Sequence, residues 1–152
     1  MTLFIWICLY LVYLSGVSSI GVTYVTQTSI DRYWMLSDIC ARWQGPITVA
    51  VFVPSTDRTT PLLQKGPPRG CDIGDQFRQV IHPAKNAEEV ADYPVNMLRN
   101  LAVSLVTTSH FLVVDIDFWP SSNLKAEIQG IWWQLVSDPS MAIVVPAFAR
   151  DG

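Results

Sequence analysis

Short apolar segments alternate with helical periodicity along the chain. Residues 22–26 predict a strand, and a helix follows, for which Ser29 and Asp31 are candidate N-caps. One apolar stripe of that helix is formed at three-to-four spacing by Tyr33, Leu36, Cys40 and Trp43. Residues 47–53 (ITVAVFV) are nearly all apolar and mostly β-branched, which is typical of a strand covered on both faces. This order favours an α/β sheet.

The second half of the chain repeats this alternation after a long connection. Residues 54–75 are rich in proline and glycine, which predicts a surface connection. Pro94 suits the first turn of a helix whose apolar stripe is Val95, Leu98, Leu101, Ala102 and Leu105. The remaining predicted elements are strands at 77–81, 110–114 and 141–145 and a helix at 124–135. The pattern indicates a doubly wound nucleotide-binding sheet, but the sequence contains neither GxGxxG nor GxxxxGK[ST], so it supports neither a dinucleotide fold nor a P-loop.

The first twenty residues differ from the rest in composition. Residues 3–14 (LFIWICLYLVYL) are unbroken apolar sequence, small residues follow them, and no charged residue occurs before Asp31. We predict that residues 1–20 are either a cleavable signal peptide or a signal anchor that holds the protein at a membrane. In both cases residues 21–152 face a lumen. The alternative is a buried N-terminal strand or helix.

Composition and charge narrow the class of partner. Half of the 152 residues are hydrophobic, enough for one core, and the net charge of −3 with ten scattered Lys and Arg residues argues against a nucleic-acid partner. Cys8 lies in the apolar leader, so Cys40 and Cys71 are the pair that an oxidising compartment can join, and their spacing leaves the disulfide open. His82 and His110 stand in unrelated contexts and are expected to be structural or surface residues rather than zinc ligands.

The stretch FLVVDIDFW (residues 111–119) brings two carboxylates, Asp115 and Asp117, to the end of a strand. If the extended conformation continues past Val114, residues two apart project to the same side. Ligands of open α/β sheets bind at the carboxyl ends of the strands. Two adjacent negative charges require a raised pKa or a cation, and carboxylate oxygens suit Mg²⁺ or Mn²⁺ bound together with a substrate diphosphate. The alternative is a solvated strand end.

A polar stripe on the helix after Pro94 offers a second group of candidates. Asn96, Arg99 and Asn100 lie opposite its apolar side. Such a stripe is usually the solvated face of an amphipathic helix. The amide and guanidinium groups can instead contact a nucleotide or pair with the acidic site.

Five stretches in order, over most of residues 22–148, resemble the LARGE-type glycosyltransferases, the group containing the glucuronyltransferases that extend matriglycan and its primer on dystroglycan. These stretches are VTQTSIDRYWML, CARWQGPITVAVFVP, YPVNMLRNLA, FLVVDIDFWPSSNL and IVVPAF. The resemblance implies an α/β fold of the GT-A type, a Rossmann-like nucleotide-diphospho-sugar transferase fold. It also implies a Golgi-lumen setting, a UDP-sugar donor such as UDP-glucuronate, Mn²⁺ (or Mg²⁺), and a glycan acceptor on a glycoprotein.

The resemblance also assigns site residues. Asp115, Ile116 and Asp117 match the family's DxD motif, with the two aspartates as metal ligands. Asn96 and Arg99 fall in the matching PVNxLRN block and are expected to line the donor pocket or support the DxD motif, and Arg32 falls in the matching SxDR stretch. No catalytic residue is assigned.

The chain also departs from the family. Residues 54–75 replace a helical segment of the relatives, and the chain ends at Gly152, before the family's acceptor-binding half. We therefore expect residues 21–152 to be the donor-binding, N-terminal part of a truncated GT-A domain. Two alternatives to a glycosyltransferase are a non-catalytic remnant that binds UDP-sugar without turnover, and an aspartyl-phosphate phosphatase, in which Asp115 is the nucleophile.

Overall fold

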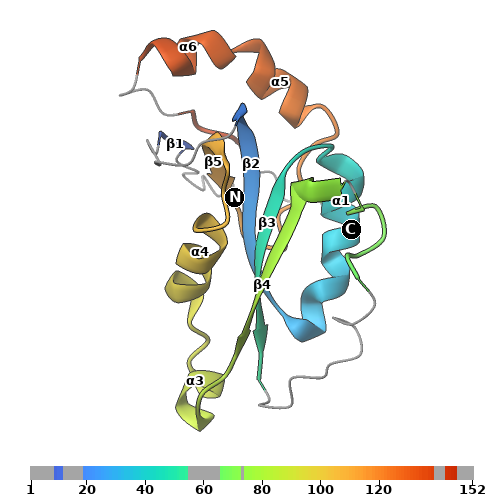
Figure 1. The fold of residues 1–152 in the computed structure, drawn as a ribbon, viewed down its shortest axis with the longest axis vertical. Coiled ribbons are helices and arrows are strands. Elements are labelled where there is room, and N and C mark those ends of the chain that lie inside the picture. Colours follow the sequence, from blue (N-terminus) through green and yellow to red (C-terminus); the bar gives the residue numbers. More distant parts are fainter. Residues whose placement is uncertain (1–8, 12–18, 55–65, 73, 139–142, 147–152) are drawn as a thin grey trace.

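The computed structural model describes residues 9–11, 19–54, 66–72, 74–138 and 143–146. A five-stranded sheet in the order β1-β5-β2-β3-β4 forms its centre (Figure 1). The strands are β1 (Leu9–Leu11), β2 (Ser19–Ser29), β3 (Ile47–Val53), β4 (Phe77–Pro83) and β5 (Thr108–Val113). β2, β3, β4 and β5 are parallel, and β1 pairs antiparallel with β5. The predicted α/β class is confirmed.

Helices cover both faces of this sheet (Figure 1). On one face lie the 3₁₀ helix η1 (Ile30–Met35) and α1 (Leu36–Arg42), and on the other lies α4 (Val95–Val103). α5 (Leu124–Gly130) and α6 (Trp132–Ser137) cross the end of the sheet at which β2 begins. The short elements η2 (Gly74–Gln76) and α3 (Ala87–Ala91) flank β4 in the sequence.

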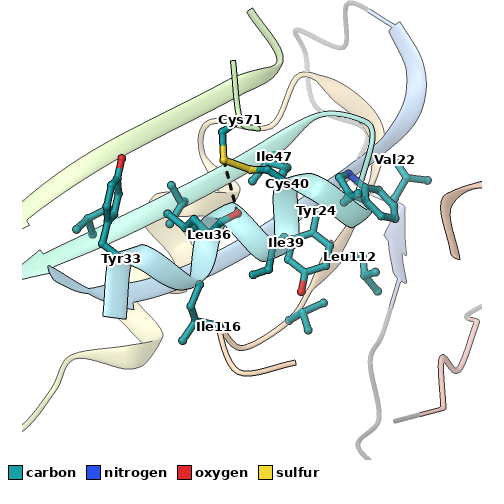
Figure 2. Close-up of a cluster of buried hydrophobic side chains, with 14 of the residues drawn as sticks. Val22, Tyr24, Tyr33, Leu36, Ile39, Cys40, Ile47, Cys71, Leu112 and Ile116 are labelled. Atoms are coloured by element: carbon teal, nitrogen blue, oxygen red, sulfur yellow. Dashed lines mark hydrogen bonds between the residues drawn. A yellow bond between two sulfur atoms is a disulfide. The ribbon is translucent and has the colours of Figure 1, made fainter. Parts of the chain in front are cut away.

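The sheet separates two hydrophobic clusters. All seven residues of β3 are buried, as expected for a central parallel strand covered by helices on both sides. On the α1 face, the predicted stripe of Tyr33, Leu36, Cys40 and Trp43 is buried against Tyr24 and its neighbours on the sheet (Figure 2). On the α4 face, Leu98 and Ala102 pack against side chains of β2, β3 and β5. The sheet therefore holds the two helical layers in fixed positions relative to its strand ends.

A disulfide joins Cys40 of α1 to Cys71 in the long connection (Figure 2). Their Cα atoms are 5.1 Å apart, and both residues are fully buried. The Cys71 sulfur lies 3.6 Å from the carbonyl oxygen of Leu36. The pairing that the sequence left open is thus present, and it ties the end of the 54–75 connection to the α1 face.

Several predicted elements differ in detail from the observed ones. The helix predicted after Ser29 begins as a 3₁₀ helix and becomes α-helical only at Leu36. The helix predicted at 124–135 is divided into α5 and α6 next to Gly130, because glycine disfavours a helix interior. α3 was not predicted. It has no apolar stripe and depends on its N-cap, where the Asn86 side chain accepts a hydrogen bond from the Glu89 amide at 2.8 Å.

The strand predicted at 141–145 is not observed in its described part. Residues 143–146 have no regular secondary structure, and residues 141 and 142 lie outside the described ranges. Both edges of β5 are already paired, with β1 and β2, so that strand has no free edge of β5 to join. Ile143 and Val145 instead pack against the cluster on the α1 face.

The assignment of residues 1–20 as a signal peptide or anchor falls mainly on residues outside the described part, and it stays a prediction. Residues 9–11 and 19–20 are described, and they belong to β1 and β2. Among the residues that the structure describes, no helix has the length and apolarity needed to cross a membrane.

Candidate functional site

The site is built on a turn that follows β5. The Val114 amide still donates to the Val25 carbonyl oxygen at 2.9 Å, but the Phe118 amide donates to the Asp115 carbonyl oxygen at 3.0 Å and closes a turn. The Tyr24 hydroxyl donates to the Phe118 carbonyl oxygen at 2.7 Å and holds that turn against β2. The condition under which both carboxylates would project to the same side, an extended chain past Val114, is therefore not met, because the chain leaves the strand conformation before it reaches Asp117.

Each carboxylate of the turn has an arginine partner. Arg99 Nη2 lies 2.7 Å from Asp115 Oδ1, and Arg32 Nη2 lies 3.3 Å from Asp117 Oδ2. Arg99 belongs to α4 and Arg32 to η1, so the two partners reach the turn from opposite faces of the sheet. The acidic pair predicted from the sequence is thus accompanied by two guanidinium groups. The side chains of Asp115 and Asp117 remain 40% and 53% exposed, which leaves both accessible to a ligand.

A buried glutamine joins this site, and the sequence analysis missed it. Gln27 Nε2 donates to Asp115 Oδ1 at 3.2 Å, so this oxygen accepts from both Gln27 and Arg99. The Tyr93 hydroxyl donates to Gln27 Oε1. Gln27 lies in β2 and is only 7% exposed. The signal available in the sequence was an amide residue inside an otherwise strand-forming stretch, because a buried amide needs hydrogen-bond partners.

The other predicted site residues occupy different surroundings. The Ile116 side chain is buried in the cluster on the α1 face (Figure 2) and also borders a cavity of about 210 Å³. That cavity is lined by Gln27, Thr28, Ser29, Arg32, Tyr93 and Ile116. Asn96 is exposed on α4, three residues before Arg99, and its proposed role stays a prediction. The structure therefore brings together Asp115, Asp117, Arg99 and Arg32 near the small cavity.

Burial keeps the tyrosines of the site protonated. Burial raises the pKa of Tyr93 to about 12; the charge of Arg32 opposes this shift, and the charge of Asp115 adds to it. Burial, together with Asp115 and Asp117, also raises the pKa of Tyr24 far above its usual value. Both hydroxyls therefore remain hydrogen-bond donors throughout the physiological pH range.

The residues after the turn separate into a buried and an exposed aromatic group. Phe118 packs against the cluster on the α1 face. Trp119 is 44% exposed, and the Arg42 guanidinium lies 5.6 Å from the centre of its ring. Phe118 is therefore a core residue, whereas Trp119 forms a cation–π contact at the surface.

A larger cavity of about 770 Å³ lies at the other end of the parallel strands. It is bordered by the beginnings of β2, β3, β4 and β5 and by α5 and α6. Its charged lining residues are Asp75, Arg78 and Lys125. Size alone favours this cavity as the ligand-binding site. The paired carboxylates, however, lie at the carboxyl ends of the strands, where ligands of open α/β sheets bind, so we take that end as the candidate site.

The turn has a donor set that fits a hard divalent cation. Within the described ranges, no cluster of three or more His, Cys, Asp or Glu side chains could hold a metal ion. Mg²⁺ and Mn²⁺, however, often use one or two protein carboxylates and complete their coordination with substrate phosphates and water. Asp115 and Asp117 meet that requirement. His82 and His110 do not contribute, since His82 pairs with Glu89 at 2.9 Å and His110 is 2% exposed in the core.

A parallel α/β sheet with paired carboxylates after one strand is consistent with a GT-A-like glycosyltransferase domain. The chain belongs to a family described as glycosyl-transferase for dystroglycan, whose sequence pattern matches residues 21–65 and 66–151. The family resemblance seen in the sequence is thus confirmed.

Curated relatives agree with this family. The chain is 33% identical over 143 residues to the glycosyltransferase-like protein gnt14 of Dictyostelium discoideum, covering 86% of this chain and 20% of the relative. It is 33% identical over 139 residues to the xylosyl- and glucuronyltransferase LARGE1 of Danio rerio, covering 87% and 17%. It is 32% identical over 143 residues to human LARGE1, covering 90% and 18%. The chain therefore spans about a fifth or less of the length of these relatives.

Proposed function

We propose that residues 21–152 are the donor-binding part of a metal-dependent glycosyltransferase. The proposed reaction moves a sugar, glucuronic acid in the first instance, from a UDP-sugar to a hydroxyl of a glycan on a glycoprotein, as in matriglycan-type synthesis. The observation that carries the proposal is the pair Asp115 and Asp117 at the carboxyl end of β5, in a chain that belongs to this glycosyltransferase family. Xylosyl- and glucuronyltransferase are the activities in the printed names of the LARGE relatives.

Each residue of the site has a role in this proposal. Asp115 and Asp117 hold Mn²⁺ or Mg²⁺, and the bound cation supplies Lewis-acid stabilisation of the charge on a departing diphosphate. The Arg99 and Arg32 guanidinium groups hold the carboxylates in place before the donor arrives, and they offer further donors for diphosphate oxygens. Ile116 anchors the turn in the core, and the cavity beside it gives room for part of the donor.

The disulfide supports a lumenal setting. Disulfides persist in the secretory pathway and are rare in the cytosol. Cys40 and Cys71 are joined, and both are fully buried. Together with the apolar leader, this supports our proposal of a Golgi protein whose residues 1–20 are a signal peptide or a membrane anchor.

The binding test uses calorimetry with UDP and Mn²⁺. The variant Asp115→Asn with Asp117→Asn removes two negative charges with almost no change of shape. We expect its Mn²⁺-dependent affinity for UDP to fall about 100-fold or more, since the loss of residues that merely support metal ligands already costs 10–100-fold. The matched control is Asp72→Asn with Asp75→Asn, which removes the same charge from exposed residues outside the site. Unchanged UDP affinity in the site variant refutes the proposal.

Binding and transfer are tested separately, because the chain spans about a fifth or less of its relatives' length. The second candidate function is UDP-sugar binding without transfer. Incubation of the chain with UDP-glucuronate, Mn²⁺ and a glycan acceptor, followed by mass spectrometry, distinguishes the two. Glycan extended by one sugar establishes a transferase. UDP affinity without product establishes a binding module. The phosphatase alternative loses its support, because the chain belongs to a glycosyltransferase family.

A further inference from the structure

We propose that Gln27 and Tyr93 are positioning residues that set the orientation of the Asp115 carboxylate toward the cation. This inference rests on the proposed function of the carboxylate pair. It concerns two residues outside the DxD motif, one on β2 and one just before α4, that are joined to Asp115 by consecutive hydrogen bonds.

The chemistry of the three groups fixes the direction of these hydrogen bonds. An ionised carboxylate only accepts, so the Gln27 amide must turn its NH₂ group toward Asp115. The Gln27 carbonyl oxygen then faces Tyr93, and the Tyr93 hydroxyl must be the donor. Only one arrangement of the amide satisfies both neighbours. The carboxylate therefore selects which end of Gln27 faces it, and the Tyr93 hydroxyl, by donating to Gln27 Oε1, helps to hold the amide in that orientation.

The same contacts divide the two oxygens of Asp115 between different tasks. Oδ1 accepts from Gln27 at 3.2 Å and from Arg99 at 2.7 Å. Among the described residues, the hydrogen bonds and the ion pair of the Asp115 carboxylate all go to Oδ1. Arg99 supplies the positive charge. Gln27 donates a second hydrogen bond from a different direction, and the two bonds together restrict rotation of the carboxyl group. Oδ2 is thereby left as the oxygen available to a cation.

Burial makes this connection rigid. Gln27 is 7% exposed within β2, and rotation of its amide breaks two hydrogen bonds. The ring of Tyr93 packs edge-on against Phe52, with the ring centroids 5.3 Å apart. Packing therefore holds the Tyr93 ring in place even when its hydroxyl is removed, and Tyr93→Phe tests the hydrogen bond alone.

The structure contains a matched control for this substitution. The Tyr33 hydroxyl donates to Gln79 Oε1 at 2.7 Å, which is a second tyrosine–glutamine pair on the same sheet without a contact to Asp115. Burial raises the pKa of Tyr33 to about 12, as it does for Tyr93, so the two hydroxyls are in the same protonation state. Tyr33→Phe removes an equivalent hydrogen bond without affecting the proposed orientation of the carboxylate.

The experiment measures Mn²⁺ affinity by electron paramagnetic resonance at saturating UDP, with the thermal midpoint of each variant recorded in parallel. We expect Tyr93→Phe and Gln27→Leu to weaken Mn²⁺ binding by about 10–100-fold, the range found for residues that orient metal ligands. Tyr33→Phe should change it less than about twofold. Wild-type Mn²⁺ affinity in both Tyr93→Phe and Gln27→Leu overturns the inference. Equal losses in Tyr93→Phe and Tyr33→Phe also overturn it, because the effect is then general loosening of the sheet.

A comparison of binding with stability provides a readout that a purely structural role does not move. Tyr93→Phe and Tyr33→Phe each remove one tyrosine–glutamine hydrogen bond, so both should lower the thermal midpoint by similar amounts. Only Tyr93→Phe should weaken Mn²⁺ binding. A loss of Mn²⁺ affinity that follows the thermal midpoint in both variants contradicts the inference.

Failure of the inference is distinguishable from failure of the proposed function. If Asp115→Asn with Asp117→Asn binds Mn²⁺ and UDP as wild type does, the proposed function fails and the positioning role fails with it. If that variant loses binding while Tyr93→Phe and Gln27→Leu keep wild-type affinity, only the positioning role is wrong.

Discussion

Reduction of the Cys40–Cys71 disulfide is expected to destabilise the fold substantially. The two cysteines are 31 residues apart in the sequence, and a cross-link that closes a loop of this length restricts the unfolded chain by about 4 kcal/mol at 25 °C on the chain-entropy account. Both sulfurs lie in the cluster on the α1 face, so the native packing around them has little freedom to adjust. With a urea dependence of about 2 kcal/mol per molar, the unfolding midpoint should fall by roughly 2 M.

The assay is urea unfolding followed by tryptophan fluorescence, to which the fully buried Trp43 contributes. All proteins carry Cys8→Ser, so that Cys40 and Cys71 are the remaining cysteines. The midpoint is measured with and without a strong reductant. The control variant, Cys40→Ser with Cys71→Ser, should have a low midpoint that the reductant does not change. A reductant-induced shift below about 0.5 M in the protein with both cysteines refutes the argument from loop closure.

Three further predictions concern the stability of the sheet and its layers. Leu98→Ala should lower the free energy of unfolding by about 2–5 kcal/mol in urea titrations, because Leu98 is fully buried between α4 and the sheet; a loss below 1 kcal/mol contradicts this packing. Tyr33 and Tyr93 have pKa values raised to about 12, whereas unfolded tyrosines ionise near 10, so stability should be intact below pH 10 and fall as the pH rises from 10 to 12. The absence of such a fall in urea midpoints rules out the raised values. Burial lowers the pKa of His110, so its contribution should be complete above about pH 6.5 and be lost as the pH falls below that value. Urea midpoints between pH 7 and 5 should therefore decline more steeply for wild type than for His110→Gln, and equal slopes show that His110 has no such role.

The central elements were predictable because their patterns reflect local burial. The continuous apolar run at Ile47–Val53 marked a strand covered on both faces, and its bounds match β3. The stripe from Tyr33 to Trp43 marked the face of α1 that is buried. Single-turn elements such as α3 have too few residues for a periodic pattern and depend on capping hydrogen bonds, so the apolar pattern does not reveal them.

The carboxylate pair was predictable, but its environment was not. Asp115 and Asp117 are two positions apart in the sequence, and their place after a buried strand indicates a ligand-binding end of the sheet. The hydrogen bond that closes the turn depends on the Phe118 amide, and a pattern of apolar and polar residues does not specify it. Gln27 reaches the site from 88 positions away in the sequence, a contact that only the pairing of β2 with β5 creates. Arg99 and Arg32 were named as candidates, but the carboxylate to which each one binds follows from the tertiary structure.

Arg99 of α4 and Arg32 of η1 reach one turn from opposite faces of the sheet. The two arginine–aspartate distances therefore depend on the positions of two different helices. We expect a substitution that displaces α4 to alter the distance from Arg99 to Asp115 more than the distance from Arg32 to Asp117, because Arg99 belongs to α4 and Arg32 to η1. A change in η1 has the reverse effect. Probes attached near each arginine can therefore report on movement of either layer when UDP and Mn²⁺ are added.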